Sequence, residues 1–379
     1  MNKIFSAAVN FFKKETVLCA AWLLAIVSCF AVRPDREYLS YVDLRTLGIL
    51  WSLMIIMQGL RKNGVFDRMS GFLLGRTDRI WKLAAVLVGL CFFSSMFITN
   101  DVSLITFVPF AVMILESAEK TELLIPVIVL QTLAANLGSM LTPIGNPQNL
   151  YLYGISGMSV TEFMGVMLPY SLLSLVMLII GLLLIPGKAA PVKPPEPEAT
   201  GKKAAGKGRT AVYAILFILS LTTVFRVVPY YITAGLVLIS VLIIDRKLIL
   251  RADYALLLTF VGFFIFTGNI HRIPALSDAV SNMLRGNEVI FSAAASQVIS
   301  NVPAALLLAD FTDNLRGLLI GVNIGGLGTL IASMASLISY KAYAGVKGAK
   351  KGRYMLIFTA ANVIFLAAEL LLALILGEL

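Results

Sequence analysis

The residues best suited to chemistry in this sequence are small polar groups that interrupt long apolar stretches. One group lies in the middle of the apolar run over residues 83–115, and a second interrupts the run over residues 288–309. Polar side chains are costly in hydrocarbon unless they find partners, so such groups are candidate functional sites. The first group consists of Thr99, Asn100, Asp101 and Ser103, and the second of Ser300, Asn301 and Pro303. Each break predicts a hairpin tip where two half-length helices meet inside a bilayer.

Two further polar breaks lie within apolar segments, at residues 136–149 and 323–336. Both are rich in Gly, Thr, Ser and Asn, and Pro143 and Pro147 remove backbone donors that a continuous helix needs. A broken helix leaves free N–H groups at one half and free C=O groups at the other. The N–H ends carry partial positive charge that suits an anion, and the carbonyl ends are ligands for Na⁺. The four breaks together predict one substrate site flanked by two ion sites.

The breaks recur at matching positions in the two halves of the chain. Residues 136–153 align with residues 323–340 at a constant offset of 187, and residues 95–100 match residues 296–301 at an offset of 201. In the first alignment the identical pairs are Asn136/Asn323, Gly138/Gly325, Thr142/Thr329, Ile144/Ile331, Leu150/Leu337 and Tyr153/Tyr340. A repeat whose copies start from opposite sides of a membrane is typical of transporters, because exchanging the conformations of the halves opens the site to either side.

The repeated positions define the candidate site residues. We expect the substrate to be bound by Asn100, Asn136, Asn301, Asn323, Thr142, Thr329, Gly138 and Gly325. We expect ion coupling to involve Asp101, Thr99, Ser300, Asn149 and Asn146. Three roles stay open for Asp101: a proton carrier, a cation ligand, or a cap on the helix that follows it. A lone glycine in a membrane helix more often serves packing, and a lone asparagine often serves interhelical contact, so the repetition in both halves favours the functional interpretation.

The elements that must position these residues are membrane helices. The 379 residues are 59% hydrophobic and only 14% charged, with a mean hydropathy of +0.89. Apolar runs of about 17–25 residues recur along the chain, and each could cross a hydrocarbon core of about 30 Å. If the N-terminus is cytoplasmic and both hairpins return to the side they entered from, 24 of the 31 Lys and Arg residues are cytoplasmic, as the positive-inside rule requires. We expect a multi-pass protein of the cell inner (plasma) membrane with its C-terminus outside.

The predicted fold is all-α and polytopic, with two inverted repeats, about nine transmembrane helices, two re-entrant hairpins and two broken helices. Residues 1–186 form the first repeat, with a surface helix at 1–15, scaffold helices, the hairpin 83–115 and the broken helix 123–153. The Pro-, Lys- and Gly-rich residues 187–209 form a cytoplasmic linker. Residues 210–379 form the second repeat, with scaffold helices, the hairpin 288–309, the broken helix 315–340 and a last helix at 354–376. Two full crossings within 83–115 would give the same parity, so this alternative stays open.

Several classes of function find no support in the sequence. The net charge of +10 is spread over short loops between apolar runs, so no nucleic-acid partner is expected. Cys19, Cys29 and Cys91 lie in apolar runs without the spacing of a metal site or a disulfide framework. No P-loop, metal-hydrolase motif or nucleophile elbow is present, so we expect no enzyme, no ATP-driven pump and no cofactor. Glu369, in the last span, is expected either to pack or to extend to the membrane interface.

The same segments resemble the ion transporter superfamily, which includes arsenite permeases, NhaD-type sodium–proton antiporters, and citrate and dicarboxylate symporters. The resemblance is carried by residues 99–105 (TNDVSLI), 136–149 (with TPIGNPQN), 300–304 (SNVPA) and 323–329 (NIGGLGT), and the first two look most like the arsenite-permease branch and its uncharacterised anion-permease relatives. It implies an elevator mechanism, in which the hairpins and broken helices move against a scaffold that commonly dimerises. The tips read Thr99-Asn100-Asp101 and Ser300-Asn301-Val302 instead of the Ser-Asn-Thr of dicarboxylate symporters, so the carboxylate recognition and sodium sites of that group are not carried over.

The sequence thus predicts a secondary active transporter of a small anion or oxyanion, carboxylate-like or arsenite-like, coupled to H⁺ or Na⁺. A Na⁺/H⁺ antiporter of NhaD type is the alternative, and a channel is a further one. The expected partners are a small inorganic or organic anion, membrane lipids and a second copy of the chain in a homodimer, with Na⁺ as the one coupling ion besides H⁺.

Overall fold

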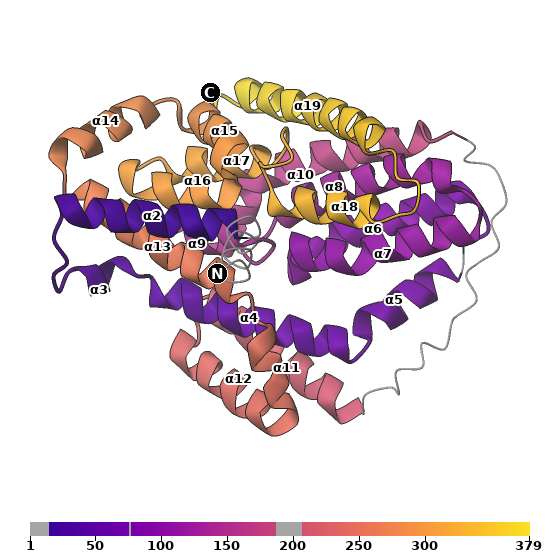
Figure 1. Ribbon diagram of the computed structural model, residues 1–379, viewed down its shortest axis with the longest axis horizontal. Helices are drawn as coiled ribbons and strands as arrows, with labels where there is room; N and C mark the ends of the chain where they lie inside the picture. The colour runs from indigo at the N-terminus through magenta and orange to yellow at the C-terminus, as the bar shows by residue number, and fades with distance from the viewer. Residues whose placement is uncertain (1–14, 76, 187–206) are drawn as a thin grey trace, which may run out of the picture.

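The computed structural model describes residues 15–75, 77–186 and 207–379, which fold as an assembly of helices (Figure 1). The helices of the first half are α2 (Thr16–Ala31), α3 (Tyr38–Tyr41), α4 (Leu44–Lys62), α5 (Val65–Leu74), α6 (Ile80–Ile98), α7 (Asn100–Ser117), η1 (Thr121–Leu123), α8 (Leu124–Ser139), α9 (Pro147–Ser156) and α10 (Val160–Leu183). Those of the second half are α11 (Lys207–Val224), α12 (Tyr230–Asp245), η2 (Arg246–Arg251), α13 (Tyr254–His271), α14 (Pro274–Leu284), α15 (Glu288–Ile299), α16 (Asn301–Leu308), η3 (Ala309–Phe311), α17 (Leu315–Ile324), α18 (Met334–Ala344) and α19 (Lys351–Ile375).

The described helices carry the length and the surface of a membrane protein. Six segments are long and apolar enough to cross a bilayer: α6, α7, the stretch Thr121–Ser139, α10, α13 and α19. Large apolar side chains lie on the outside, with Phe30 86% exposed and Ile243 80% exposed. Such a surface is stable against lipid but not against water. The prediction of an all-α polytopic membrane protein is confirmed.

Two helical hairpins form at the predicted places, and their tips fall at the predicted polar residues; two full crossings by the first hairpin stay an open alternative to re-entry. Thr99 separates α6 from α7, and Ser300 separates α15 from α16. The arms of the second hairpin have 12 and 8 residues, too short to cross a bilayer. The arms of the first have 19 and 18 residues, longer than the half-length helices expected there, because α6 already begins at Ile80 and α7 runs on to Ser117.

Both predicted broken helices also form. The first is α8 followed by α9, with the chain unwound over residues 140–146. The second is α17 followed by α18, unwound over residues 325–333. Pro147 is the first residue of α9, where its missing N–H costs nothing, and the side chain of Asn146 caps that helix by accepting a 2.9 Å bond from the Asn149 N–H.

The hairpins and broken helices are interlocked across the two halves. The hairpin α6–α7 packs on α8 of its own half and, through α7, on α18 of the other half. The hairpin α15–α16 packs on α17 of its own half and, through α16, on α9 of the other half. At the lower edge of the molecule in Figure 1, α4 packs with α11 and α12. α2 packs along α13, which itself contacts α16.

Two amphipathic helices and one segment boundary differ from the expectation. The short helices α5 and α14, which were not predicted, precede the first and second hairpin. Residues 1–14 of the expected surface helix and residues 187–206 of the expected linker lie outside the described residues. Residues 207–209 belong to α11, so the linker ends earlier than predicted, since this helix extends back into the Lys- and Gly-rich stretch.

Candidate functional site

The two hairpin tips share one unusual backbone conformation. Thr99 has φ 69° and ψ 152°, and Ser300 has φ 73° and ψ 153°. This region of backbone space is essentially reserved for glycine, and a residue with a side chain held there costs on the order of 1–3 kcal/mol. Such strain persists only where surrounding contacts enforce it, so its occurrence at both tips marks them as candidate functional positions.

Each tip is tied to the unwound segment of its own half by the same hydrogen bond. The Asn100 N–H donates to the Gly145 carbonyl at 3.1 Å, and the Asn301 N–H donates to the Ala332 carbonyl at 3.0 Å. The side chains of these asparagines also match, because Asn100 Oδ1 accepts from the Asp101 N–H and Asn301 Oδ1 accepts from the Val302 N–H. Both asparagines are buried, and Asn100 Nδ2 donates to Asn136 Oδ1 at 3.2 Å. The tips are therefore built alike, as the repeated sequence predicts.

Asn136 of α8 forms hydrogen bonds with the N-terminal end of α18, the second part of the broken helix in the other half. Its Oδ1 accepts from Ser333 Oγ at 3.0 Å, and its Nδ2 donates to Ser336 Oγ at 3.4 Å. Asn323 makes the reverse contacts, accepting from Asn146 Nδ2 at 3.1 Å and donating to Asn149 Oδ1 at 2.7 Å. Residues 146 and 149 are each 187 positions before 333 and 336, the same offset that relates 136 to 323.

These side chains form one buried polar cluster, which we call the asparagine cluster. It contains Asn100, Asn136, Asn146, Asn149, Asn301, Asn323, Ser333 and Ser336, all of them buried. The N-termini of α7, α9, α16 and α18 begin at or next to members of the cluster. Four helix N-termini around amide and hydroxyl groups give a site with donors for an anion and with acceptor oxygens for a small cation.

The free carbonyls at the ends of α8 and α17 are capped by amide side chains. Asn149 Nδ2 donates to the carbonyls of Ser139, Met140 and Thr142 at 3.0–3.3 Å. In the second half the same function falls to Gln297 of the hairpin, whose Nε2 donates to the carbonyls of Gly325 and Leu327 at 2.9 Å. The amides hold the unwound segments in place, as backbone groups inside a membrane require.

Four of the predicted substrate ligands instead face the hairpins. Thr142 Oγ1 donates to the Met96 carbonyl at 2.5 Å, and Thr329 Oγ1 donates to the Gln297 carbonyl at 3.0 Å. A side-chain carbon on Gly138 would lie 2.1 Å from the Phe92 carbonyl oxygen, and one on Gly325 would lie 2.8 Å from the Cα of Ala293. The two threonines thus hydrogen-bond the unwound segments to the hairpins. The two glycines allow close packing of the broken helices against α6 and α15. The contacts seen for these four residues support the site, and their expected role as substrate ligands stays a prediction.

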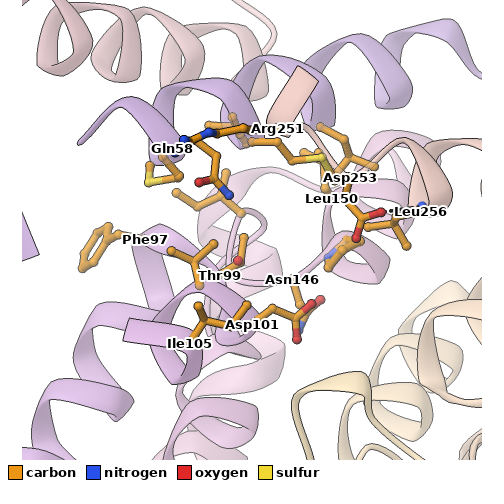
Figure 2. Close-up of a pocket in the computed structure, with 17 residues that line it drawn as sticks. Gln58, Phe97, Thr99, Asp101, Ile105, Asn146, Leu150, Arg251, Asp253 and Leu256 are labelled. Carbon is orange, nitrogen blue, oxygen red and sulfur yellow. Dashed lines mark hydrogen bonds between the residues drawn. The ribbon is translucent and has the colours of Figure 1, made fainter. Parts of the chain in front are cut away.

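Asp101 lies beside the asparagine cluster on the wall of a cavity of about 140 Å³ (Figure 2). The other wall is formed by α4, the end of η2 and the start of α13, which bring Gln58, Arg251 and Asp253 to the cavity. Figure 2 shows the carboxyl groups of Asp101 and Asp253 entering from opposite walls, with Thr99 and Asn146 below Gln58. The position equivalent to Asp101 in the second hairpin is Val302, so the charge is present at one tip only.

Ser300, the predicted ion-coupling residue at the second tip, is buried, and its Oγ lies 3.4 Å from the Ala332 carbonyl oxygen.

A second cavity, of about 410 Å³, lies between α3, the end of α13 and η3, and is lined by Tyr41, His271, Arg272 and Asp310 among others. There Arg272 binds Asp35 at 2.8 Å and holds the pKa of that carboxyl below its ordinary value. His271 is the last residue of α13.

Several residues of the site were not predicted. Ser333 and Ser336 stand opposite Asn146 and Asn149 in the alignment of the two halves, so the repeat itself contained the signal for them. Gln297 lies in the repeated segment 296–301 but stands opposite Met96, so its signal was only a polar side chain in an apolar helix. Gln58, Arg251 and Asp253 come from helix ends and a loop far from the breaks, and only the packing of α4 and η2 brings them to the cavity. Within the described residues no cluster of His, Cys, Asp or Glu suits a metal ion.

Comparison with known proteins connects this architecture with transport. The model of the family described as "Citrate transporter" matches residues 11–316. The chain is 31% identical to the inner membrane protein YbiR of Escherichia coli (strain K12) over 83% of this chain and 84% of that protein. It is 32% identical to an uncharacterised transporter of Methanocaldococcus jannaschii over 85% and 86% of the two chains. A shorter match, 30% identical over 36% of this chain and 28% of the other, is to the silicon efflux transporter LSI3 of Oryza sativa subsp. japonica.

Proposed function

The chain belongs to the citrate transporter family of membrane transporters, within the ion transporter superfamily, and we propose that it is a secondary active transporter of a small anion or oxyanion coupled to H⁺ or Na⁺. The observation that carries the proposal is the asparagine cluster. It joins the first hairpin tip to Asn136 and links the two broken helices by contacts that recur at one sequence offset. The second tip is held beside it by the bond from the Asn301 N–H to the Ala332 carbonyl. A site built equally from two repeated halves is the arrangement that alternating access needs.

The asparagine cluster supplies the substrate site in this proposal. Asn100 and Asn301 hold the tips, while Asn136 and Asn323 link the halves, so their amides and the neighbouring helix N-termini surround the anion. The partial positive charge of four N-termini and neutral amide donors stabilise an anion without a buried cation of opposite charge. Arg251 lines the adjoining cavity and is the cationic side chain that an approaching anion meets there.

We propose that transport follows an elevator mechanism. In this account the two hairpins and the two broken helices move as one body, since they are interlocked across the halves, and α4, α11 and α12 form part of the scaffold. The cavity beside Asp101 supports the division, because one wall comes from α4 and η2 and the other from the first tip. With the N-terminus cytoplasmic and the C-terminus outside, the two halves are inverted repeats, and the cavity containing Arg251 opens toward the cytoplasm.

Asp101 is the proposed ion-coupling residue at the cavity, with Thr99 and Asn146 as neighbouring oxygen ligands. Its equivalent, Val302, has no charge, so the coupling site belongs to the first hairpin alone. Na⁺ and H⁺ are the two ions that such a carboxylate accepts. A Na⁺/H⁺ antiporter is the second candidate function, supported by the two carboxyl groups, Asp101 and Asp253, that enter the cavity from opposite walls.

The remaining parts of the proposal concern the setting of the protein. A position in the cell inner membrane is supported by the six apolar spans and by the name of the Escherichia coli relative. A homodimer through the scaffold is consistent with the apolar outer faces of α11 and α12, where Ile215, Ile239 and Ile243 are exposed to lipid or to a second copy.

Thermal unfolding of the purified protein with a panel of anions and undissociated oxyacids tests the proposed function. The panel contains citrate, phosphate, arsenite and silicic acid, each with and without Na⁺ and at acid and neutral pH. A ligand that binds the folded state raises its stability by mass action. A shift with one member, larger with Na⁺ or at acid pH, is the expected result. A shift with Na⁺ or Li⁺ alone supports the antiporter instead.

A further inference from the structure

Glu369 is a fully buried carboxyl group in the last helix of the chain. Its exposed fraction is 0%, and it lies six residues before the end of α19, about 9 Å from that end. Its side chain is therefore packed inside the protein, as one of the two expectations for this residue had it, and does not extend along the surface. Ser174 Oγ of α10 donates to Glu369 Oε1 at 2.5 Å, but Oε2 has no hydrogen-bond partner in the described protein.

No cationic group in the described residues pairs with this carboxyl. The helices packed against α19 are α8, α10 and α17, and α18 contacts its first turn through Tyr340 and Tyr343, 15 residues before Glu369. α8 contains no charged residue, and the titratable group that α10 brings close is Tyr170. α17 contributes Arg316, which is already bound to Glu378 at the chain end. An ionised Glu369 would be an uncompensated charge inside hydrocarbon, whereas a protonated one would be a polar but neutral group.

Unpaired polar atoms gather on the α10 face that meets Glu369. Tyr170 Oη and Ser171 Oγ have no partner in the described protein, and both lie within one helical turn of Ser174 on the same face. Asn362 Oδ1, two turns before Glu369 on α19, is also unpaired. Tyr170 lies within electrostatic reach of both Glu369 and the exposed Arg316–Glu378 pair. Tyr170 and Ser171 thus mark a polar route from the end of α19 to the carboxyl, and Asn362 lies beyond the carboxyl.

Glu288 shows what a buried structural carboxyl of this protein looks like. It is 6% exposed at the base of the second hairpin. Thr312 Oγ1 donates to one of its oxygens at 3.1 Å and Asn314 Nδ2 donates to the other at 3.3 Å. Both oxygens are thus satisfied in the ionised form, as expected of a carboxylate that only holds a loop in place. Glu369 lacks this second donor.

We propose that Glu369 is a proton-binding site of the transporter, loaded from the end of α19 past Tyr170 and Ser171, and that its protonation is linked to transport. In the loading step a hydronium ion transfers one proton to the carboxylate, which forms one O–H bond and releases one water molecule. This inference rests on the proposed function and adds a second ion-coupling group, distinct from Asp101 at the cavity. The proton is thus one of the ions coupled to transport.

Infrared difference spectroscopy of the purified protein tests proton binding without any substrate. Spectra at acid and alkaline pH are compared for wild type, Glu369→Gln and Glu288→Gln. The expected wild-type difference contains a C=O stretch of a buried protonated carboxyl that is lost in Glu369→Gln and kept in Glu288→Gln. A wild-type band that survives in Glu369→Gln, or a wild-type difference without such a band, overturns the proposal. Ser174→Ala, which keeps the acid, is expected to keep the band and excludes a general packing defect as the cause of its loss.

Transport by the same variants in proteoliposomes tests the link to the cycle, with radiolabelled citrate and arsenite as probes. We expect Glu369→Gln to keep exchange at equal pH on both sides and to lose the stimulation by a pH gradient, while Glu288→Gln keeps both. Gradient stimulation that survives in Glu369→Gln but is lost in Asp101→Asn contradicts the link. If wild type moves neither probe, the proposed function fails for these substrates, and the infrared result still decides whether Glu369 binds a proton.

Discussion

Asn136 and Asn323 make reciprocal contacts across the two halves of the chain. Asn136 bonds Ser333 and Ser336, and Asn323 bonds Asn146 and Asn149. The two sets are related by the same offset of 187 residues, yet they differ in chemistry, since one pair of partners carries hydroxyls and the other carries amides. The two halves of the site therefore share the same geometry but differ in the chemical groups that bind the asparagine.

This difference predicts unequal effects of two matched substitutions. Asn323→Ala removes a donor from buried Asn149 Oδ1 and an acceptor from Asn146 Nδ2, and each unsatisfied buried group costs about 1–3 kcal/mol. Asn136→Ala takes the acceptor from one buried amide, Asn100 Nδ2, and otherwise frees two serine hydroxyls, which can rotate toward other acceptors. Thermal unfolding should show a larger loss of stability for Asn323→Ala. An equal or larger loss for Asn136→Ala would show that the two contacts are not unequal in this way.

The strained tips predict an inversion of the usual preference for alanine over glycine. At Thr99, with φ 69°, Gly relieves strain that Ala retains, so Thr99→Gly should be more stable than Thr99→Ala. At Thr106, inside α7, Ala should be better than Gly by about 1 kcal/mol. The measurement is the melting temperature of the four variants. If the Ala variant melts above the Gly variant at both positions, the backbone at Thr99 is not strained.

Close helix packing predicts a third effect. An added methyl group at Gly138 would meet the Phe92 carbonyl oxygen at 2.1 Å, so Gly138→Ala must push α8 away from the first hairpin. Overpacking of this kind typically costs about 1–3 kcal/mol. Gly165→Ala in α10 is the matched control, because nothing lies within 4 Å of its added carbon. The yield and melting temperature of folded protein should fall for Gly138→Ala alone, and a similar fall in both variants would argue against the packing role.

The single charged tip predicts where ion dependence resides. Asp101→Asn removes the charge but keeps the size of the side chain, so it should abolish the dependence of uptake on Na⁺ or H⁺ while exchange of substrate continues. Val302→Ala, at the equivalent position of the second hairpin, should leave ion dependence unchanged. Uptake assays over a range of Na⁺ concentrations and pH values measure both. Complete loss of exchange in folded Asp101→Asn would favour the Na⁺/H⁺ antiporter.

Much of this fold could be predicted because each break left a local signal in the sequence. The tips at Thr99 and Ser300 and the unwound segments fall where polar residues interrupt apolar runs. The directions of side chains could not be predicted in the same way. Gly138 and Thr142 share the repeated pattern with Asn136, but only the packing against α6 shows that they face the hairpin.

The cavity shows the same limit of prediction from sequence. Arg251 and Asp253 lie in a connection between α12 and α13, with no local pattern that distinguishes them from other loop charges. They reach the first tip because η2 packs against α4. Glu369 could be recognised in the sequence as an acidic residue in an apolar span. The orientation that buries it against Ser174 follows only from the packing of α10 on α19.

Counterflow in proteoliposomes tests the central claim most directly, with wild type compared with the double variant Asn100→Ala/Asn301→Ala. Vesicles loaded with an unlabelled anion take up the same labelled anion by exchange. A transporter built on the asparagine cluster should show saturable uptake of at least one anion, stimulated by the internal anion, and the folded double variant should lose it. Uptake that ignores the internal anion, or that is unchanged in the folded double variant, would contradict the account.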